Sequence, residues 1–277
     1  MLLRPRIRAV SRVKLAPAFT LDREYTFETL TTGLTVDDNG NDGFDDAINS
    51  GGTTSLVSEA QANAGSKSAA FTIASAALNW GALDHYFIGP AGSGDSTLTN
   101  GQEFWTQFWA FHPTGWDDST DTSTCKFFRY RLYDNTQTPV TGTGTVSFGF
   151  VNTGTAITGL RTEREGETPN DVDITLTANG GFALNQWNKF EFYVKIASGT
   201  DGIVRAWCND KEAGEVTGVN TLGSALTTAE TLTLMWLDYW NGGAPATQTM
   251  YIDQVKIARS TTDSPTNQDA SGNYFIG

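Results

Sequence analysis

Hydrophobic and polar residues alternate in short runs along most of the chain, which is the pattern of β-strands that bury one face. Such runs predict strands at residues 68–73, 84–87, 103–111, 126–133, 146–151, 173–176, 189–196, 203–209, 212–216, 232–239 and 250–257. Turn-forming Gly, Asn, Asp and Pro residues separate the runs, and only residues 224–230 are compatible with a helical turn. The pattern therefore predicts an all-β, antiparallel sandwich or barrel.

Alternation also divides each predicted strand into a core face and an open face. In the run 189–196, Phe190 and Phe192 are core positions, whereas Tyr193 and Lys195 are open. The run 103–111 is apolar on both sides, as expected of a central strand or of one that lines a groove. Aromatic and arginine side chains on one sheet face suit either a glycan-binding surface or a protein interface, and the sequence leaves both interpretations open. The residues of this candidate face are Trp109, Arg129, Arg131, Tyr193, Arg205 and Trp207.

Composition adds an acidic body to this picture. The chain has 277 residues and a formal net charge of −13, which fits one large domain and argues against non-specific nucleic-acid binding by the body. No apolar run approaches the roughly 20 residues needed to cross a bilayer. We also expect no secretory signal peptide, because basic residues from Arg4 to Lys14 interrupt the stretch that would have to be apolar.

The first residues form a basic arm in front of the acidic body. Its positive charges are Arg4, Arg6, Arg8, Arg12 and Lys14, and residues 4–9 alternate basic and apolar positions, which predicts an extended segment. An extended terminus is ordered only when a surface holds it, and that surface is either a neighbouring subunit, which we favour, or the protein's own body. We divide the chain into the arm (1–22), the sandwich (23–259) and a polar C-terminal strap (260–277).

Two further features are read as structural. The acidic loop 35–52 approaches a calcium-loop spacing at Asp38, Asp42 and Gly43, but the closing glutamate is missing, so we interpret it as an acidic turn. Cys125 and Cys208 each border a predicted strand and are interpreted as two buried thiols, although the sequence does not exclude a disulfide.

Four segments resemble the concanavalin A-like lectin/glucanase superfamily, the jelly-roll sandwiches that include laminin G-like modules and several polysaccharide lyases. They are "GSKSAAFTI" (65–73), "EFWTQFWAFHP" (103–113), "WNKFEFYVKIASGTDGIVRAWCND" (187–210) and "MYIDQVKIA" (250–258). The resemblance covers roughly residues 25–258 and implies a two-sheet jelly roll. It also implies a structural calcium at Glu28 and Asp253, for which the alternative is a pair of hydrogen-bonded acids.

The resemblance does not bring a complete catalytic motif with it. Glucanases of this superfamily carry an E-x-D-x-x-E strand, and no such run occurs in the sequence. Lyases need a base and a group that neutralises the uronate carboxylate, and the short match Tyr193-x-Lys195 to a Y-x-K motif is all that the sequence offers at matching positions. A lyase would therefore use Tyr193, Lys195, Arg129 and His112.

From these features we expect a non-enzymatic structural or binding protein of a larger assembly, a virion component such as a phage capsid decoration or tail-associated protein, with glycan binding as a second role. It would require no cofactor beyond the implied calcium. It would contact subunits of the same assembly, as a homo-oligomer or hetero-assembly, on a virion or extracellular particle surface. The alternative is a polysaccharide lyase or a secreted carbohydrate-binding module that acts on acidic polysaccharide.

Overall fold

The computed structural model describes residues 20–37, 42–44, 46–48, 52–75, 81–86, 100–117, 125–133, 145–153, 156–164, 171–174, 181–221, 231–239 and 244–260. Within these ranges the chain consists of strands and turns, with no helix. The charged residues of the basic arm, residues 261–277 of the strap and the expected helical turn at 224–230 lie outside the described residues. No described segment is a helix long and apolar enough to span a membrane.

The first sheet has the strand order β13-β12-β11-β6-β15-β4-β3, and β1 pairs with β15 beside this path. Its strands are β1 (Thr20–Tyr25), β3 (Thr53–Ser58), β4 (Ser68–Ile73), β6 (Glu103–Phe111), β11 (Trp187–Lys195), β12 (Gly202–Cys208), β13 (Lys211–Val219) and β15 (Gln248–Ser260). β1 begins inside the segment expected to be the arm, and it pairs antiparallel with the second half of β15.

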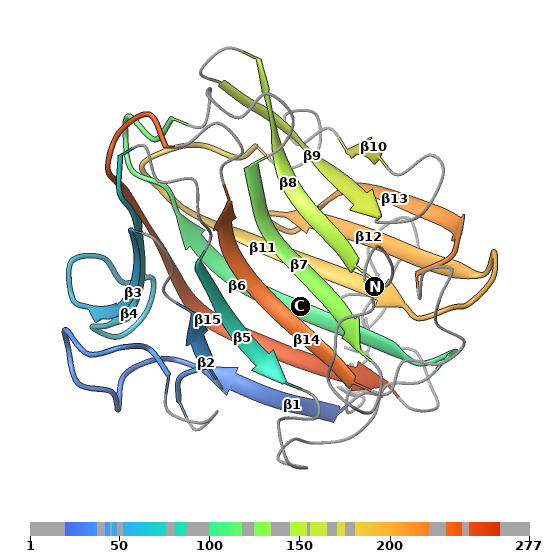
Figure 1. Ribbon diagram of the computed structural model, residues 1–277, viewed down its shortest axis with the longest axis horizontal. Coiled ribbons are helices and arrows are strands. Elements are labelled where there is room, and N and C mark those ends of the chain that lie inside the picture. Colours follow the sequence, from blue (N-terminus) through green and yellow to red (C-terminus); the bar gives the residue numbers. More distant parts are fainter. Residues whose placement is uncertain are drawn as a thin grey trace, which may run out of the picture.

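The second sheet has the order β10-β9-β8-β7-β14-β5-β2. Its strands are β2 (Asp46–Ile48), β5 (Gly81–Tyr86), β7 (Cys125–Tyr133), β8 (Thr145–Thr153), β9 (Ala156–Arg164), β10 (Asp171–Ile174) and β14 (Thr231–Tyr239). The two sheets form the stacked layers of a jelly-roll sandwich, with β7 and β14 of one layer across β6 and β11 of the other (Figure 1). The all-β, antiparallel two-sheet fold expected from the sequence is confirmed.

Phenylalanine rings hold the two layers together. Phe108, Phe190 and Phe192 of the first sheet are fully buried, and Phe128 of the second sheet packs on them with ring centroids 5.6 Å from Phe108 and 5.0 Å from Phe192. Burying a phenylalanine contributes about 1.5–3 kcal/mol, so this stack is a major part of the core's stability. Phe190 and Phe192 are the positions that alternation assigned to the core.

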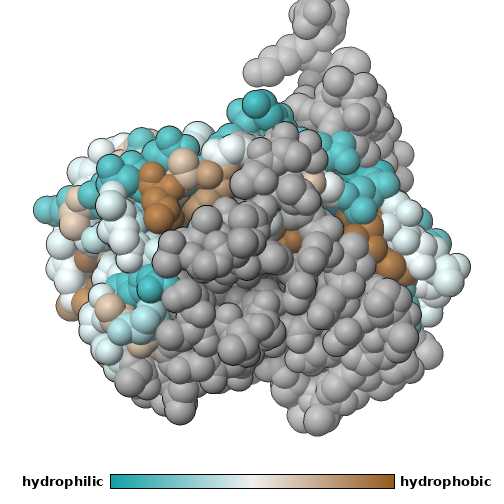
Figure 2. Space-filling view, turned by 90° about the horizontal axis from the view of Figure 1, so that it is seen from above, coloured by the Kyte–Doolittle hydropathy of each residue, from teal (hydrophilic) through white to brown (hydrophobic). Residues whose placement is uncertain are grey.

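The described surface shows little apolar material. In the space-filling view, brown areas are small and bordered by hydrophilic or neutral residues (Figure 2). Among the described residues, Leu34 is the single large hydrophobic side chain that is exposed, at 61%.

The acidic turn before β2 is an anchor for the start of the sandwich. The Asp42 carboxylate accepts hydrogen bonds from the backbone and hydroxyl groups of Thr26 and Thr29 and from the backbone of Phe27. At the next position only glycine fits, because a Cβ on Gly43 would lie 2.2 Å from the carbonyl oxygen of Val36. The interpretation of Asp42 as part of a turn therefore agrees with its hydrogen bonds.

Candidate functional site

The outer face of the first sheet carries an aromatic cluster at the place where the sequence predicts a glycan-binding face. Tyr193 of β11 is in register with Trp105 of β6 and with Arg205 of β12. Trp105, Tyr193 and Trp207 form a separate hydrophobic cluster, with exposed fractions of 0%, 3% and 3%. Because these rings are buried, they offer no open surface on which a polysaccharide can stack.

Tyr193 is fixed within this cluster by its polar neighbours. Its hydroxyl hydrogen-bonds Glu103, and the Arg205 guanidinium lies 5.1 Å from its ring centre while pairing with Glu215. Burial, followed by the nearby Glu103 charge, raises the pKa of Tyr193 far above the ordinary tyrosine value. Burial also raises the pKa of Glu103. A tyrosine held in its protonated form by its surroundings is poorly suited to act as a base.

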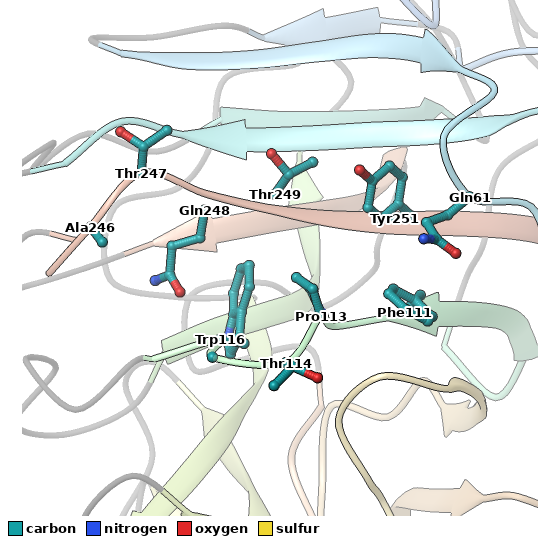
Figure 3. Close-up of a pocket in the computed structure, with 11 residues that line it drawn as sticks. Gln61, Phe111, Pro113, Thr114, Trp116, Ala246, Thr247, Gln248, Thr249 and Tyr251 are labelled. Atoms are coloured by element: carbon teal, nitrogen blue, oxygen red, sulfur yellow. The ribbon is translucent and has the colours of Figure 1, made fainter.

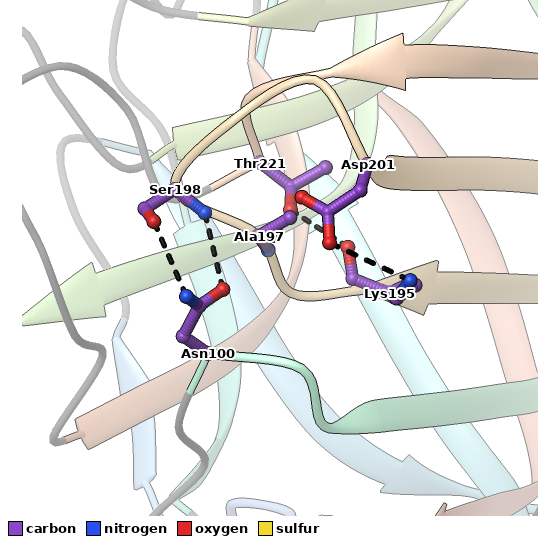
Figure 4. A network of polar contacts seen from close by, with 6 residues as sticks. All are labelled: Asn100, Lys195, Ala197, Ser198, Asp201 and Thr221. Atoms are coloured by element: carbon purple, nitrogen blue, oxygen red, sulfur yellow. Dashed lines mark hydrogen bonds and ion pairs between the residues drawn. The ribbon is translucent and has the colours of Figure 1, made fainter.

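Lys195 belongs to the hairpin between β11 and β12 (Figure 4). Its ammonium lies 3.7 Å from the exposed carboxylate of Asp201, and its carbonyl accepts a hydrogen bond from the Thr221 hydroxyl. The same hydroxyl accepts from the backbone of Ala197. Lys195 therefore helps to shape a turn, whereas Tyr193 belongs to the aromatic cluster. The two residues of the short Y-x-K match thus have different structural roles.

His112 lies beyond the other end of β6, seven positions from Trp105 and so roughly 20 Å from the Tyr193 cluster. It is fully buried, with ring centroids of Trp116 and Phe182 at 4.8 Å and 5.5 Å. Burial lowers the pKa of His112 to about 3, so the imidazole is neutral at physiological pH. Its surroundings are those of a core residue.

Arg129 and Arg131 belong to β7, in the middle of the second sheet (Figure 1). Of the expected glycan face, the structure therefore brings together Tyr193, Arg205 and Trp207 on the first sheet. The half-buried Trp109 lies farther along β6. Arg129 and Arg131 belong to the other sheet. The four residues proposed from sequence for a lyase, Tyr193, Lys195, Arg129 and His112, do not converge. The physical reason is that alternation identifies the face of a strand but not the sheet to which the strand belongs.

Backbone register groups residues on the outer side of the second sheet. Arg129 is in register with Ser147 of β8 and Met235 of β14, and Arg131 is in register with Thr145 and Thr233 of the same two strands. One end of β7 places Lys126 opposite Tyr239 of β14. Lys126 is also in register with Gly149 of β8, and Gly149 is in register with Arg161 of β9. Arg161 follows Leu160, which is buried. The second-sheet face, as we call the positions of Lys126, Arg129, Arg131, Arg161 and Tyr239, thus combines four basic residues and a tyrosine, and its register rows also contain the acids Glu163 and Asp84, which pair with the two neighbours of Arg129.

Lys126 and Tyr239 are functional candidates that the sequence reasoning missed. Each lies at the end of a predicted strand, and a register shift between Trp236 and Tyr239 determines which residues meet. The signal that the sequence did contain is the three basic residues of "KFFRYRLY", of which Arg129 and Arg131 are two positions apart. The pairing with a strand more than a hundred residues away is set by the topology.

The two residues implied to hold calcium both bind one loop. Glu28 accepts hydrogen bonds from the backbone of Ser66 and Lys67, and Asp253 accepts from the backbone of Asn63 and Ala64. Burial raises the pKa of Glu28, but its hydrogen bonds outweigh this effect and leave the pKa below the ordinary value. Burial raises the pKa of Asp253. In the described part of the chain no group of three or more acidic, His or Cys residues could hold a metal. The calcium site stays a prediction.

No protein-family model matches the chain, and no curated protein matches it. Solved structures do match. Alginate lyase Aly36B, as a mutant in complex with alginate tetrasaccharide, superposes with a TM-score of 0.59 and 13% identity over 88% of this chain and 97% of that one. Endo-β-1,4-glucuronan lyase from the fungus Trichoderma reesei gives 0.53 and 12%, over 86% and 100%. A carbohydrate esterase from the Shiga toxin-encoding bacteriophage phi24B gives 0.51 and 14%, over 88% and 100%.

These similarities confirm the jelly-roll sandwich fold expected from the sequence. They overturn the expectation of a non-enzymatic virion component, because the matching structures at the head of the comparison are polysaccharide lyases. The arm and its partner subunits stay predictions, since the charged arm residues lie outside the described residues.

Proposed function

We propose that this protein is a polysaccharide lyase that cleaves uronate-containing chains on the second-sheet face. The observation that carries the proposal is the pair Arg129 and Arg131, two positions apart on the central strand β7, with Lys126 of the same strand opposite Tyr239. The fold is compatible with this chemistry, because the matching structures include lyases of alginate and glucuronan. Fold alone does not assign an activity, so this group of basic residues is what singles out an acidic substrate.

Arginine suits the recognition of a uronate. Its guanidinium is always charged and binds a carboxylate through two parallel hydrogen bonds. Arg129 and Arg131 are two positions apart on one strand, which spaces them by about 7 Å along β7. The rest of the protein is strongly acidic, so a local group of cations is also the place where an anionic polymer would be attracted.

The cleavage would proceed by β-elimination. A base removes the proton from the sugar carbon next to the carboxylate, the electron pair forms a carbon–carbon double bond, and the glycosidic carbon–oxygen bond breaks. The departing oxygen takes up a proton, so atoms balance without water. An arginine that neutralises the carboxylate stabilises the negative charge that develops on it. Arg129 would serve this role.

Tyr239 is our candidate for the proton transfers. Residues directly opposite in an antiparallel pair have Cβ atoms about 5 Å apart, so Lys126 lies next to Tyr239. An ammonium next to a phenol stabilises the tyrosinate, which is the form that can accept a proton. In Aly36B, the variant that holds alginate tetrasaccharide has a lysine and a tyrosine replaced by alanine. That pair of residue types supports, for this chain, a lysine and a tyrosine in one site.

The test is to incubate the full chain with alginate, glucuronan and polygalacturonate and to follow the ultraviolet absorbance of the unsaturated product. We expect activity on at least one polymer, a loss of about 100-fold or more in Tyr239→Phe, and a comparable loss in Arg129→Ala. Arg205→Ala is the matched control, because Arg205 belongs to the first sheet, and it should retain activity. Polymer binding without cleavage would identify a carbohydrate-binding module instead. Full activity of Tyr239→Phe would exclude the assigned site.

A further inference from the structure

A pocket of about 250 Å³ lies at one end of the first sheet, between β15 and the segment 113–117 that follows β6 (Figure 3). Of the three aromatic residues that line it, Tyr251 is half-buried and can offer a ring face, whereas Phe111 and Trp116 are buried, with exposed fractions of 7% and 4%. Polar groups between them come from Gln61 and from the hydroxyls of Thr114, Thr247 and Thr249. None of the described residues that line the pocket is charged. It is the combination of aromatic faces and uncharged hydrogen-bonding groups that defines the pocket chemically.

Both walls of the pocket are held in place by contacts outside it. The Phe111 ring packs against Trp187 and Tyr251, with ring centroids 5.6 Å and 6.1 Å away. On the opposite wall, the Gln248 side chain accepts a hydrogen bond of 2.7 Å from the backbone of Asp117 and donates one back to its carbonyl. The walls are therefore already ordered before a ligand binds. This lowers the entropic cost of binding and favours binding of a small molecule.

The β15 wall is fixed in the same way. The Thr249 hydroxyl shares a hydrogen bond of 2.7 Å with the Thr72 hydroxyl of β4, and the Thr247 hydroxyl accepts one from the backbone of Ser75. In Figure 3, Thr247, Thr249 and Tyr251 follow one another along β15, so hydroxyl groups recur along one side of the pocket. Each hydroxyl can both donate and accept, which matches the hydroxyls of a sugar.

We propose that this pocket binds a neutral sugar unit, a hexose or pentose without a carboxylate. The half-buried Tyr251 ring suits the apolar face of a pyranose, and the threonine and glutamine groups suit its hydroxyls. The absence of arginine and lysine from the lining disfavours a uronate, which the acidic body of the chain would also repel. The pocket is smaller than the range of about 300–1,000 Å³ used by drug-sized ligands, so it fits a chain end or a single ring rather than a long polymer segment. The proposal is independent of the lyase activity, because it concerns the first sheet.

Two-dimensional amide NMR of the full chain tests the proposal directly. D-glucose, D-galactose, D-mannose and D-xylose are titrated one at a time, with D-glucuronate as the charged counterpart. We expect at least one neutral sugar to shift the amide signals of Gly115 and Ala246, with a dissociation constant on the order of 1 mM. D-glucuronate should shift them at least about tenfold more weakly. The absence of shifts at these amides for every neutral sugar, or shifts confined to other regions, would overturn the proposal.

Variants of Tyr251 give a second measurement. Tyr251→Ala removes an aromatic wall and should weaken binding of the neutral sugar at least about tenfold, whereas Tyr251→Phe keeps the ring and should change it less than about threefold. Equal affinity of wild type and Tyr251→Ala would contradict the assigned pocket. Tyr239→Phe should bind the neutral sugar as wild type does, so failure of the lyase proposal and failure of this one are distinguishable.

Discussion

Asp42→Asn tests how the start of the sandwich is anchored. One carboxylate oxygen of Asp42 accepts from the backbone and hydroxyl of Thr26 and from the backbone of Phe27, and the other accepts from the backbone and hydroxyl of Thr29. Asparagine can keep the first oxygen. Its amide group replaces the second oxygen, so the backbone N–H and the hydroxyl of Thr29 lose their acceptor. The N–H groups of the new amide then face these two donors.

The size of the effect follows from those two interactions. Hydrogen bonds to a charged group contribute about 1.5–3 kcal/mol each when buried. Asp42 is only half-buried, so water replaces part of what is lost, and we expect the free energy of unfolding to fall by about 2 kcal/mol in total. For a domain of this size that lowers the midpoint of thermal unfolding by about 4–8 °C. Asp37→Asn, an exposed acid in the same region, should change it by less than about 2 °C.

The pH dependence provides an independent check. Burial raises the pKa of Asp42, but the hydrogen bonds from Thr29 and Thr26 outweigh this and lower it below the ordinary value of 3.8. A carboxylate with a lowered pKa in the folded state stabilises the protein above its unfolded pKa, and this contribution is lost as pH falls through the folded value. Differential scanning calorimetry should therefore show a gap between wild type and Asp42→Asn at pH 7 that shrinks below about pH 4. Equal midpoints at pH 7, or a gap that stays constant in acid, would refute the anchoring role.

Other predictions concern the first sheet and its loops. Tyr193→Phe should lower the free energy of unfolding by about 1 kcal/mol, because it loses a buried hydrogen bond. The same variant should cleave polyuronates as wild type does. Loss of activity would restore Tyr193 as a catalytic candidate. Burial raises the pKa of Cys208 to about 12, so iodoacetamide should leave its peptide unmodified in the native protein at pH 8 and modify it after denaturation, as read by mass spectrometry. Gly65→Ala should be about 2 kcal/mol more destabilising in chemical denaturation than Gly33→Ala, because both positions have positive φ but a Cβ at 65 would also lie 2.3 Å from a carboxylate oxygen of Glu28; similar losses would contradict the clash.

Much of the fold could be read from the sequence because a sandwich core imposes a period of two. The predicted strand 189–196 illustrates this, since Phe190 and Phe192 are buried in the core and β11 contains all of its residues except the last. Residues that fix turns were also visible, as in the Asp-Gly pair at the β11–β12 hairpin, where a Cβ on Gly202 would lie 2.3 Å from the Val219 carbonyl oxygen. Short or irregular strands such as β1 and β2 were missed, because they carry little alternation of their own.

The site was much less predictable than the fold. Tyr193 was correctly assigned to an outer face, but the sequence could not reveal that this face is buried, since burial depends on what packs over a strand. Arg129 and Tyr193 looked like neighbours because both are open positions, yet their strands belong to different sheets. His112 is the most instructive case. A histidine after an aromatic strand suggests chemistry, and three-dimensional packing makes it a neutral core residue instead.

The most direct test of the lyase assignment is to digest a polyuronate with the full chain in water enriched in heavy oxygen and to weigh the products by mass spectrometry. Elimination breaks the glycosidic bond without consuming water, so the account predicts oligosaccharides that are lighter by one water than hydrolysis products and that carry no heavy oxygen at the cleaved ends. Saturated products that contain heavy oxygen, or intact polymer after incubation with alginate, glucuronan and polygalacturonate alike, would contradict it.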